Sequence, residues 1–295
     1  MDYLDKYGYA PDREEIGRAI EMIAANMDNI ASEQVYKDCF SMMDLTTLKT
    51  DDTPASVAKL VEKVNAFHKS YPEWPLPASV CVFSNFAATV KEVRKEDFNI
   101  TVVSACFPSS QSFLEVKLKE VEMAVEQGAD EVDIVLALNA FLAGNYEVAA
   151  EEIRQVRRVI DEVAGKQGRN VHLKVILETG LLKTPENIAN ASFLAMEAGA
   201  DFIKTSTGKV DVNATPLAAY VMCECIGIYR MATGKKIGFK PAGGISSAAD
   251  ALCYYSIVSS LLGKDWLNKE LFRFGVSRVA NSLLSAVEQK TVSYF

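Results

Sequence analysis

Two lysines of this sequence lie within short apolar segments that are expected to form buried strands. Lys204 follows Phe202-Ile203, and Lys240 follows Gly238-Phe239. Because side chains alternate along a strand, each lysine faces away from the apolar residue before it. Two amines in one cavity favour Schiff-base chemistry, since burial and a neighbouring cation both disfavour the ammonium form and leave a nucleophilic amine. Repulsion between two cations ~4 Å apart is about 4 kcal/mol at an effective dielectric constant of ~20.

Acidic side chains follow the same alternation in neighbouring segments. Asp133 and Asp44 each lie on the strand face opposite their apolar neighbours, and Lys174 shares one face of its segment with Glu178. Parallel strands are buried on both faces, so charges clustered near their carboxyl ends favour an active site over salt bridges that only fill the interior. An iminium on a lysine withdraws electrons from a carbon–carbon bond without a metal. Asp133 is then the candidate acid/base that moves the protons.

Glycine-rich turns follow three of the apolar segments and form a second candidate site. Such turns, and the helix N-termini that follow them, present free backbone N–H groups to a phosphate. One turn of this kind is more often structural, whereas three turns at the same end of a barrel favour a phosphate site. The turns are Thr207-Gly208-Lys209, Gly243-Gly244-Ile245-Ser246 and Gly275-Val276-Ser277-Arg278.

Eight apolar segments of strand length alternate with helical periods and must position these side chains. Three of the helices begin with a capping threonine followed by proline, at Thr53, Thr184 and Thr215. The alternation predicts an α/β protein with a parallel (β/α)₈ TIM barrel. An open doubly wound sheet is the alternative, but no Gly-x-Gly-x-x-Gly motif follows the first strand segment. The strand segments are residues 41–48, 79–84, 100–106, 131–136, 172–178, 202–207, 237–243 and 271–277.

Residues 1–38 precede the repeat and are expected to form an N-terminal helical extension. Their apolar side chains recur at helical spacing, which predicts one or two helices packed on the barrel. Residues 39–295 are expected to form a single (β/α)₈ barrel catalytic domain, because no low-complexity linker interrupts them. The apolar stripe of the extension consists of Ile16, Ile20, Ile23, Ala24 and Met27.

The composition of the 295 residues argues against several classes of protein. The net charge of −8 disfavours a general nucleic-acid binder, which needs a positive surface for the phosphates. No apolar run approaches the roughly 20 residues of a membrane span, and the N-terminus lacks the features of a signal peptide. The six cysteines are scattered and fit reduced thiols in a cytoplasmic protein. The two histidines, His68 and His172, form no metal-spaced cluster, which disfavours a zinc hydrolase or a zinc-dependent aldolase, and we expect no metal.

The sequence resembles the deoxyribose-phosphate aldolases, which are class I Schiff-base aldolases with a (β/α)₈ barrel. The resemblance covers about residues 39–290. It implies reversible cleavage of 2-deoxy-D-ribose 5-phosphate to D-glyceraldehyde 3-phosphate and acetaldehyde, in the catabolism of deoxyribonucleotides and without a cofactor. The matching strings are Met43-Asp44-Leu45-Thr46-Thr47-Leu48, Gly128-Ala129-Asp130-Glu131-Val132-Asp133, Lys204-Thr205-Ser206-Thr207-Gly208-Lys209, Val212-Asn213-Ala214-Thr215-Pro216, Gly238-Phe239-Lys240-Pro241-Ala242-Gly243-Gly244 and Phe272-Arg273-Phe274-Gly275.

The resemblance also implies roles for individual residues. Lys204 corresponds to the Schiff-base nucleophile, Lys240 to the partner that lowers its pKa, and Asp133 to the proton-relay acid/base that acts with a bound water. Asp44 would orient Lys240 and the substrate hydroxyls. Without the resemblance, the residues do not show which lysine is the nucleophile. Those implied to line the substrate and phosphate pocket are Thr207, Gly208, Lys209, Gly243, Gly244, Gly275 and Ser277.

Two segments differ from the family pattern. The family often has arginine where Ser246 stands and a second serine where Arg278 stands, so we hypothesise that Arg278 supplies the phosphate charge. The alternative is an exposed helix arginine without a substrate contact. Tyr294 corresponds to a C-terminal tyrosine that can reach the active site in some members, but here Phe295 follows it, and its role stays open.

Two other functions stay open at this point. One is another phosphosugar Schiff-base aldolase of the same fold, although Asp133 with the paired Lys204 and Lys240 favours the first reaction. The other is a catalytically weakened barrel that serves mainly as a protein-binding module, which the presence of Lys204 and Asp133 disfavours. The expected partners are small phosphosugar and aldehyde substrates, and not nucleic acid or a membrane. A homodimer is compatible with the sequence, which does not determine the oligomeric state.

Overall fold

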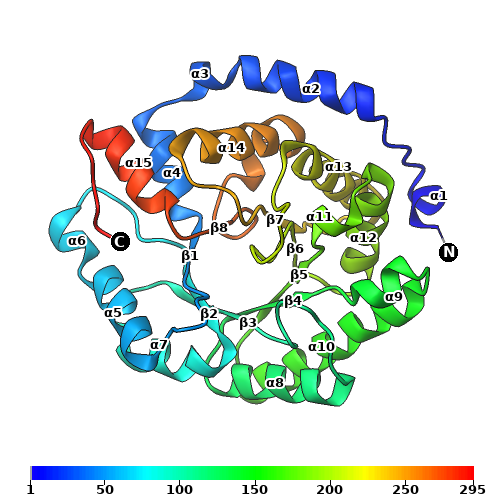
Figure 1. The fold of residues 1–295 in the computed structure, drawn as a ribbon, viewed down its shortest axis with the longest axis horizontal. Helices are drawn as coiled ribbons and strands as arrows, with labels where there is room; N and C mark the ends of the chain where they lie inside the picture. Colours follow the sequence, from blue (N-terminus) through cyan, green and yellow to red (C-terminus); the bar gives the residue numbers. More distant parts are fainter. Residues whose placement is uncertain (1) are drawn as a thin grey trace.

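The fold centres on a ring of eight parallel strands (Figure 1). The computed structural model describes residues 2–295. Neighbouring strands pair in the order β7-β6-β5-β4-β3-β2-β1-β8, and bridges from Phe239 to Phe272 and from Ala242 to Gly275 join the two end strands. The predicted (β/α)₈ barrel is therefore confirmed, and the open doubly wound sheet is wrong. The strands are β1 (Met43–Thr46), β2 (Ser79–Phe83), β3 (Asn99–Val103), β4 (Glu131–Val135), β5 (His172–Ile176), β6 (Phe202–Lys204), β7 (Gly238–Lys240) and β8 (Phe274–Val276).

All eight predicted strands are present, and each ends earlier than predicted. The residues beyond each carboxyl end leave the sheet and form the loops at the mouth of the barrel. At β1 the amino end also differs, because helix α4 (Glu33–Ser41) continues to Ser41 and the Met42 N–H donates to the Asp38 carbonyl at 3.2 Å. The first strand therefore begins at Met43 instead of residue 41.

Helices follow the strands and surround them (Figure 1). The hydroxyls of Thr53, Thr184 and Thr215 each accept a hydrogen bond from a first-turn backbone N–H, and a proline starts each of these helices, as predicted. The barrel helices are α5 (Pro54–Asn65), α6 (Phe67–Ser70), α7 (Ala87–Val93), α8 (Leu114–Glu126), α9 (Leu138–Leu142), α10 (Tyr146–Lys166), α11 (Thr179–Leu182), α12 (Pro185–Glu197), α13 (Pro216–Thr233), α14 (Ala248–Leu262) and α15 (Val279–Glu288), with 3₁₀ helices η1 (Ser84–Phe86) and η2 (Lys264–Trp266).

Alternate residues of a strand face two different environments, as β4 illustrates. Val132 and Ile134 belong to the apolar core, which fills the space between the sheet and the helices. Asp133, between them, meets lysines from β5, β6 and β7 inside the barrel. The period of two along the strand therefore keeps the apolar core and the polar interior of the barrel apart.

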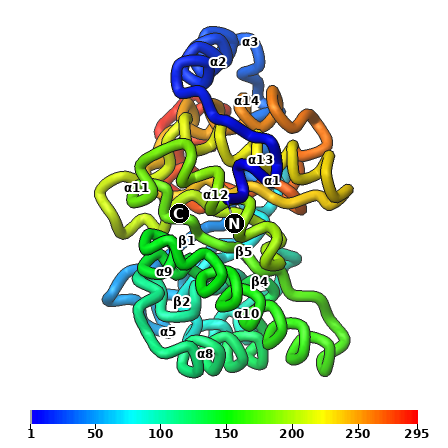
Figure 2. Tube along the Cα trace, turned by 90° about the vertical axis from the view of Figure 1, so that its right-hand side faces the viewer, coloured from blue at the N-terminus to red at the C-terminus, as the bar shows by residue number. Residues whose placement is uncertain are grey.

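Between residue 2 and β1 the structure has four helical segments, more than the one or two predicted. Besides α4 they are α1 (Tyr3–Tyr7), α2 (Arg13–Ala25) and α3 (Met27–Ile30). Figure 2 shows α2 and α3 on the outside of the barrel, and residue contacts join α2 to α13 and α14. Helix α1 lies against α12, where the Tyr7 ring stacks on Phe193 with centroids 4.3 Å apart. The N-terminal residues thus cover one side of the barrel.

The apolar stripe of this N-terminal part is less buried than its spacing suggested. Ile16 is buried, Ile20 and Ile23 are half-buried, and Ala24 is exposed. The division into an extension of residues 1–38 and a catalytic domain of residues 39–295 stays a prediction, and its boundary lies inside α4. Helix α4 leads into β1 without a linker, so the structure shows no break in the chain at residue 38.

The hydropathy of the helices and the state of the cysteines can be assessed over the described residues. Within residues 2–295, no helix is long and apolar enough to cross a membrane. All six cysteines are free thiols, and four of them are buried. Burial raises the pKa of the Cys39 and Cys81 thiols, which keeps both in the neutral form.

Candidate active site

Seven charged side chains fill the interior of the barrel. Three are carboxylates and four are cations, and none is more than 3% exposed. Charged groups are rarely buried this completely unless they are paired. They come from β1, β4, β5, β6, β7 and the residue before β8, so the barrel brings together residues that are far apart in the sequence. These residues, called the interior charge network below, are Asp44, Glu131, Asp133, Lys174, Lys204, Lys240 and Arg273.

Three lysines converge on Asp133. The Nζ atoms of Lys204 and Lys240 lie 2.8 and 2.7 Å from Asp133 Oδ2, and Lys174 Nζ lies 3.0 Å from Oδ1. The sheet register causes this convergence, because Lys204 is the partner of Lys240 across β6 and β7, and Asp133 is the partner of Lys174 across β4 and β5. The barrel therefore brings the predicted catalytic residues Lys204, Lys240 and Asp133 into direct contact.

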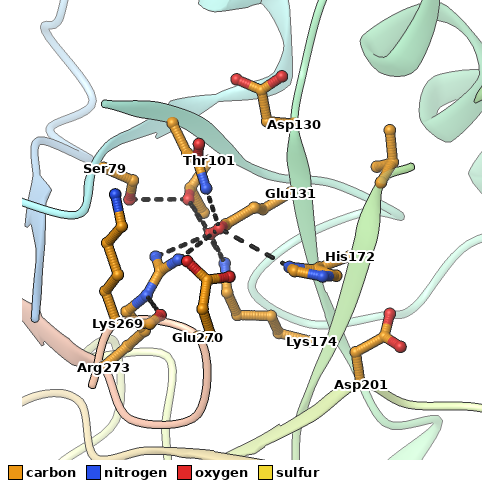
Figure 3. Close-up of polar contacts among 12 residues, drawn as sticks. Ser79, Thr101, Asp130, Glu131, His172, Lys174, Asp201, Lys269, Glu270 and Arg273 are labelled. Carbon is orange, nitrogen blue, oxygen red and sulfur yellow. Dashed lines mark hydrogen bonds and ion pairs between the residues drawn. The ribbon is translucent and has the colours of Figure 1, made fainter. Parts of the chain in front are cut away.

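Arg273 holds the part of the network that lies away from the barrel mouth. Its guanidinium donates to Glu131 through Nη2 at 2.6 Å and through Nη1 at 3.0 Å, and Nη1 also donates to Asp44 at 2.6 Å. Figure 3 shows Arg273 and Lys174 converging on Glu131, with which Lys174 forms an ion pair. Arginine suits this position because its planar fork pairs with both oxygens of one carboxylate.

Asp44 connects Arg273 to Lys240. Its carboxylate forms an ion pair with Lys240 and accepts a hydrogen bond from the Ser79 hydroxyl at 2.8 Å. Burial alone would raise the pKa of Asp44, but Lys240, Lys174 and Arg273 outweigh burial and hold that pKa well below its usual value. Asp44 is therefore ionised, and its contact with Lys240 agrees with the orienting role predicted for it.

Lys204 differs from the other two lysines in its number of carboxylate partners. Among residues 2–295 it pairs with Asp133 alone, whereas Lys240 has two carboxylate partners and Lys174 has three. Burial lowers the pKa of the Lys204 amine, and the single carboxylate does not compensate because Lys240 adds a second lowering effect. At Lys240 and Lys174 the carboxylates outweigh burial and raise the pKa. Lys204 is therefore the amine of the three that loses its proton most readily.

Asp133 is a carboxylate in the resting site. Burial would raise its pKa, but Lys174, Lys204 and Lys240 outweigh burial and hold the pKa well below its usual value. An ionised carboxylate accepts hydrogen bonds and protons and has none to donate. Asp133 can therefore serve first as a base, and as an acid only after it has taken a proton.

A cavity of about 560 Å³ opens at the carboxyl ends of the strands. Within the described chain, Lys204 is the one member of the interior charge network that lines it. The lining includes four cations and, within residues 2–295, no carboxylate, so the cavity attracts anions. All eight residues predicted to bind substrate or phosphate lie on its wall: Thr207, Gly208, Lys209, Gly243, Gly244, Gly275, Ser277 and Arg278.

Two of the glycine turns in the cavity wall need glycine for different reasons. A Cβ at Gly275 would lie 2.7 Å from Ala242 Cβ and 3.1 Å from Lys240 Cε, so a side chain there would displace the lysine. Gly243 and Gly244 have φ angles of 78° and 77°, in the left-handed region that favours glycine. The turns therefore both shape the cavity and protect the packing of the network beneath it.

Three of the four cations of the cavity come from different loops. Lys49 follows β1, Lys209 follows β6 and Arg278 follows β8, while Lys204 ends β6. Lys209 Nζ donates to the Leu48 carbonyl at 2.6 Å and so joins two loops across the cavity mouth. Lys49 was not predicted, because an isolated loop lysine carries no local signal of a binding role.

Arg278 and Ser246 line the same cavity. The two differences from the family pattern therefore lie at one site, as the hypothesis of a transferred positive charge requires. Arg278 is exposed, and the Ser246 N–H donates to the Asp250 carboxylate at 2.9 Å. That Arg278 supplies the phosphate charge stays a prediction.

Three members of the network, Glu131, Lys174 and Arg273, were not predicted as site residues, although Lys174 was noted as a charge within its strand. Glu131 stands two positions before Asp133 on β4 and therefore on the same strand face, a signal that the alternation rule contains. Arg273 stands between Phe272 and Phe274, and the same rule places it opposite both rings. The alternation of side chains, which predicted the inward direction of the lysines, could therefore have predicted Glu131 and Arg273 as well.

Glu178 does not share a strand face with Lys174, so that expectation was wrong. Strand β5 ends at Ile176, and Glu178 adopts a left-handed backbone conformation with φ +55°. Its carboxylate turns to Thr207 in the loop after β6. The alternation of side chains fails here because the chain has already left the sheet.

Tyr294 lies on the outside of the barrel, away from the residues that line the cavity. Its hydroxyl donates to the Lys63 carbonyl at 2.9 Å, and its ring meets Phe67 with centroids 5.4 Å apart. The Asn281 side-chain carbonyl accepts the N–H groups of Tyr294 and Phe295 at 2.9 and 3.0 Å. The C-terminal residues are therefore docked among α5, α6 and α15.

The fold and the site together define a barrel enzyme in which a buried, readily deprotonated lysine opens into a cationic cavity. The sequence model of the DeoC/LacD family aldolases matches residues 39–253. Because this match covers most of the chain, the protein belongs to the DeoC/LacD aldolase family and is a lyase.

Several relatives support this assignment. Human deoxyribose-phosphate aldolase is 42% identical over 261 residues, which cover 85% of this chain and 78% of the human protein. The bovine deoxyribose-phosphate aldolase is 39% identical over 259 residues, covering 84% and 78%. A solved structure, described as a tetrameric deoxyribose phosphate aldolase from Aeropyrum pernix, matches with a TM-score of 0.65 and 21% identity over 94% of this chain and 98% of that chain. At that identity the likeness concerns the fold.

Proposed function

We propose that this chain cleaves 2-deoxy-D-ribose 5-phosphate reversibly to D-glyceraldehyde 3-phosphate and acetaldehyde through a Schiff base on Lys204. The observation that carries the proposal is the environment of Lys204. It is the one lysine of the interior charge network with a single carboxylate partner and a lowered pKa, and it opens into the cationic cavity. The human and bovine relatives named deoxyribose-phosphate aldolase support the choice of substrate.

Lys204 acts as the nucleophile in this proposal. Its neutral amine attacks the aldehyde carbon of the open-chain sugar, and loss of water from the adduct leaves a protonated imine. The iminium then withdraws the electron pair of the bond between C2 and C3, while the C3 hydroxyl loses its proton and becomes the aldehyde of glyceraldehyde 3-phosphate. The remaining enamine takes up a proton at carbon, and water releases acetaldehyde and the free amine.

Asp133 is the base for the C3 hydroxyl, directly or through a water. It is ionised in the resting site, and its Oδ2 already lies 2.8 Å from Lys204 Nζ, where the reaction occurs. Lys240 stays charged beside it and lowers the pKa of Lys204 by repulsion. Asp44 keeps Lys240 in place through their ion pair.

The cavity wall would bind the phosphate of the substrate. The three glycine turns present backbone N–H groups, and Lys49, Lys209 and Arg278 add positive charge without a competing carboxylate among the lining residues in the described chain. Arg278 would carry the charge that Ser246 lacks. The same cavity would leave unphosphorylated sugars with fewer contacts.

Trapping with borohydride tests the proposal. The protein is incubated with acetaldehyde or with 2-deoxyribose 5-phosphate in the presence of borohydride, and the adduct is mapped by mass spectrometry. We expect a reduced adduct at Lys204, its loss in Lys204→Met, and no change in Lys235→Met, which removes an exposed lysine. Absence of an adduct together with EDTA-sensitive turnover would overturn the Schiff-base mechanism.

The assembly and the location of the protein stay predictions. The sequence is compatible with a homodimer and does not determine the oligomeric state, whereas the solved aldolase from Aeropyrum pernix is described as tetrameric. Light scattering on the eluting protein separates a dimer from a tetramer by mass. A cytoplasmic location agrees with six free thiols, which are typical of a reducing compartment.

A further inference from the structure

The turn after β5 adopts an unusual backbone conformation at Glu178. Its φ and ψ angles are 55° and 58°, in the left-handed region that side chains other than glycine rarely adopt. The surrounding hydrogen bonds hold the turn in this form, since the Leu177 N–H donates to the Lys204 carbonyl at 2.8 Å and the Thr179 N–H donates to the Thr205 carbonyl at 2.9 Å. Strained residues of this kind persist where the structure around them specifies a particular side-chain position.

The turn directs the Glu178 carboxylate to a single residue. Oε2 accepts the Thr207 hydroxyl at 2.6 Å, and Oε1 accepts the Thr207 backbone N–H at 3.2 Å. Glu178 is 2% exposed, and Thr207 lines the catalytic cavity. The Thr207 oxygen in turn accepts the Lys209 N–H at 3.1 Å. A buried carboxylate thus fixes Thr207, in the loop after β6, at both of its donors.

These contacts decide what the Thr207 hydroxyl can offer to a substrate. A threonine hydroxyl has one proton and two lone pairs. The proton goes to Glu178, at a length typical of a hydroxyl that donates to an ionised carboxylate. Lys209 N–H takes one lone pair. One lone pair remains, and it can accept a hydrogen bond from a substrate hydroxyl but can donate nothing to a phosphate.

We propose that Glu178 is a positioning residue that makes Thr207 a hydrogen-bond acceptor for a hydroxyl of the substrate. The inference rests on the proposed function, because it concerns the same cavity and the same sugar. It divides the cavity wall by chemistry, since the glycine turns and cations meet the phosphate whereas Thr207 meets a hydroxyl. Burial raises the pKa of Glu178 and the hydrogen bonds from Thr207 oppose that rise, so the contact with Thr207 also helps to keep the carboxylate charged.

The Glu178→Gln variant tests the direction of the hydrogen bond. The glutamine amide can accept the Thr207 N–H through its oxygen, but its NH₂ then donates to the threonine oxygen and occupies the lone pair meant for the substrate. We expect kcat/KM for 2-deoxyribose 5-phosphate to fall roughly 10- to 100-fold, the range for a buried hydroxyl donor left without an acceptor. Borohydride trapping of acetaldehyde, which has no hydroxyl, should proceed at the wild-type rate.

Four further variants keep the test decisive. Thr207→Val should lose a similar factor, and the double variant should lose no more than either single variant, because Glu178 acts through Thr207. Glu178→Gly permits the left-handed turn, so its Tm should stay close to that of the wild type while kcat/KM falls as in Glu178→Gln. Glu186→Gln, which alters an exposed glutamate nearby in the sequence, should leave cleavage unchanged.

Failure of this inference is distinguishable from failure of the proposed function. If the wild type neither cleaves the sugar nor forms an adduct, the proposed function is wrong. If the wild type does both and Glu178→Gln cleaves equally well, the inference alone is wrong. It is also wrong if the single losses multiply in the double variant, or if trapping of acetaldehyde falls together with cleavage, since either result would indicate general damage to the site.

Discussion

The two ends of the interior charge network both contain buried cations and carboxylates, but they differ in the number of carboxylates that each cation contacts. Around Arg273 and Lys174, each cation meets at least two carboxylates, and none of these groups lines the cavity. At the other end, Lys204 meets one carboxylate and a second lysine, and it does line the cavity. The first arrangement holds its charges firmly, whereas the second leaves one amine poorly stabilised as an ammonium.

This difference shows that the pKa of a buried lysine here depends on the number of its carboxylate partners, not on burial alone. Lys174, Lys204 and Lys240 are all buried, yet their pKa values move in opposite directions. A buried amine with two or more carboxylate neighbours stays charged and stabilises the fold. A buried amine with a single carboxylate neighbour loses its proton more readily and is then able to act as a nucleophile. Stability and catalysis should therefore respond differently to substitutions at the two ends of the network.

Removal of Lys204 has the largest expected effect on activity. Lys204→Met removes the proposed nucleophile, so we expect kcat/KM to fall roughly 10⁴-fold or more. The free energy of unfolding should not decrease, because the lost amine is the least stabilised charge of the network. Steady-state kinetics and urea denaturation measure the two quantities. Retained cleavage would mean that another amine forms the Schiff base.

Removal of Arg273 should affect mainly stability, whereas removal of Lys204 should affect mainly activity. Arg273→Met leaves Asp44 and Glu131 buried without their guanidinium, and loss of one partner of a buried pair costs about 3–5 kcal/mol. We expect that decrease in the free energy of unfolding, measured by urea denaturation, with a smaller loss of kcat per folded molecule. Arg13→Met, at an exposed site, is the matched control. An unchanged stability would refute the structural role.

Acid should destabilise the protein by protonating Glu131, which Arg273 and Lys174 contact. Burial would raise the pKa of Glu131, but Lys174 and Arg273 outweigh burial and lower it from 4.5 to about 2. The unfolded chain therefore binds more protons below about pH 4.5, and stability falls as the pH drops from there towards 2. Denaturation at several pH values measures this slope. The slope should be shallower in Arg273→Met, where the pKa of Glu131 returns towards its ordinary value.

Removal of Lys240 should change the pH dependence of catalysis. Without its positive neighbour, the pKa of Lys204 rises, so the fraction of neutral amine at neutral pH falls. We expect the acidic limb of the kcat/KM profile to move to higher pH, with a loss of roughly 100-fold at pH 7 for Lys240→Met. Partial recovery at alkaline pH distinguishes this electrostatic effect from a collapse of the site, which would give no recovery.

Removal of Arg278 has the smallest expected effect, because this side chain is exposed. Arg278→Ala should raise KM for 2-deoxyribose 5-phosphate roughly 10-fold through loss of a hydrogen-bonded charge, with kcat and the rate of acetaldehyde trapping unchanged. Ser246→Arg in the same background should restore the low KM. An unchanged KM in Arg278→Ala would leave this arginine without a role at the phosphate.

The sequence by itself determined the strands, the helix starts and the inward direction of the central charges. These properties depend on local sterics, since alternation along β4 and β7 already places Asp133 and Lys240 inside. It also located the three glycine turns of the cavity wall. Local rules failed where the chain leaves a strand, as at Glu178, and at residue 41, where helix α4 continues up to the first strand.

Only the tertiary structure decided which lysine has a lowered pKa and where Tyr294 lies. The partners of Lys204, Lys240 and Lys174 come from strands far apart in the sequence, so their number can be counted only after the barrel is formed. The same is true of Tyr294, which Lys63 and Asn281 hold outside the cavity. Electrostatic and docking effects depend on distances between remote residues, and no local pattern of the sequence records these distances.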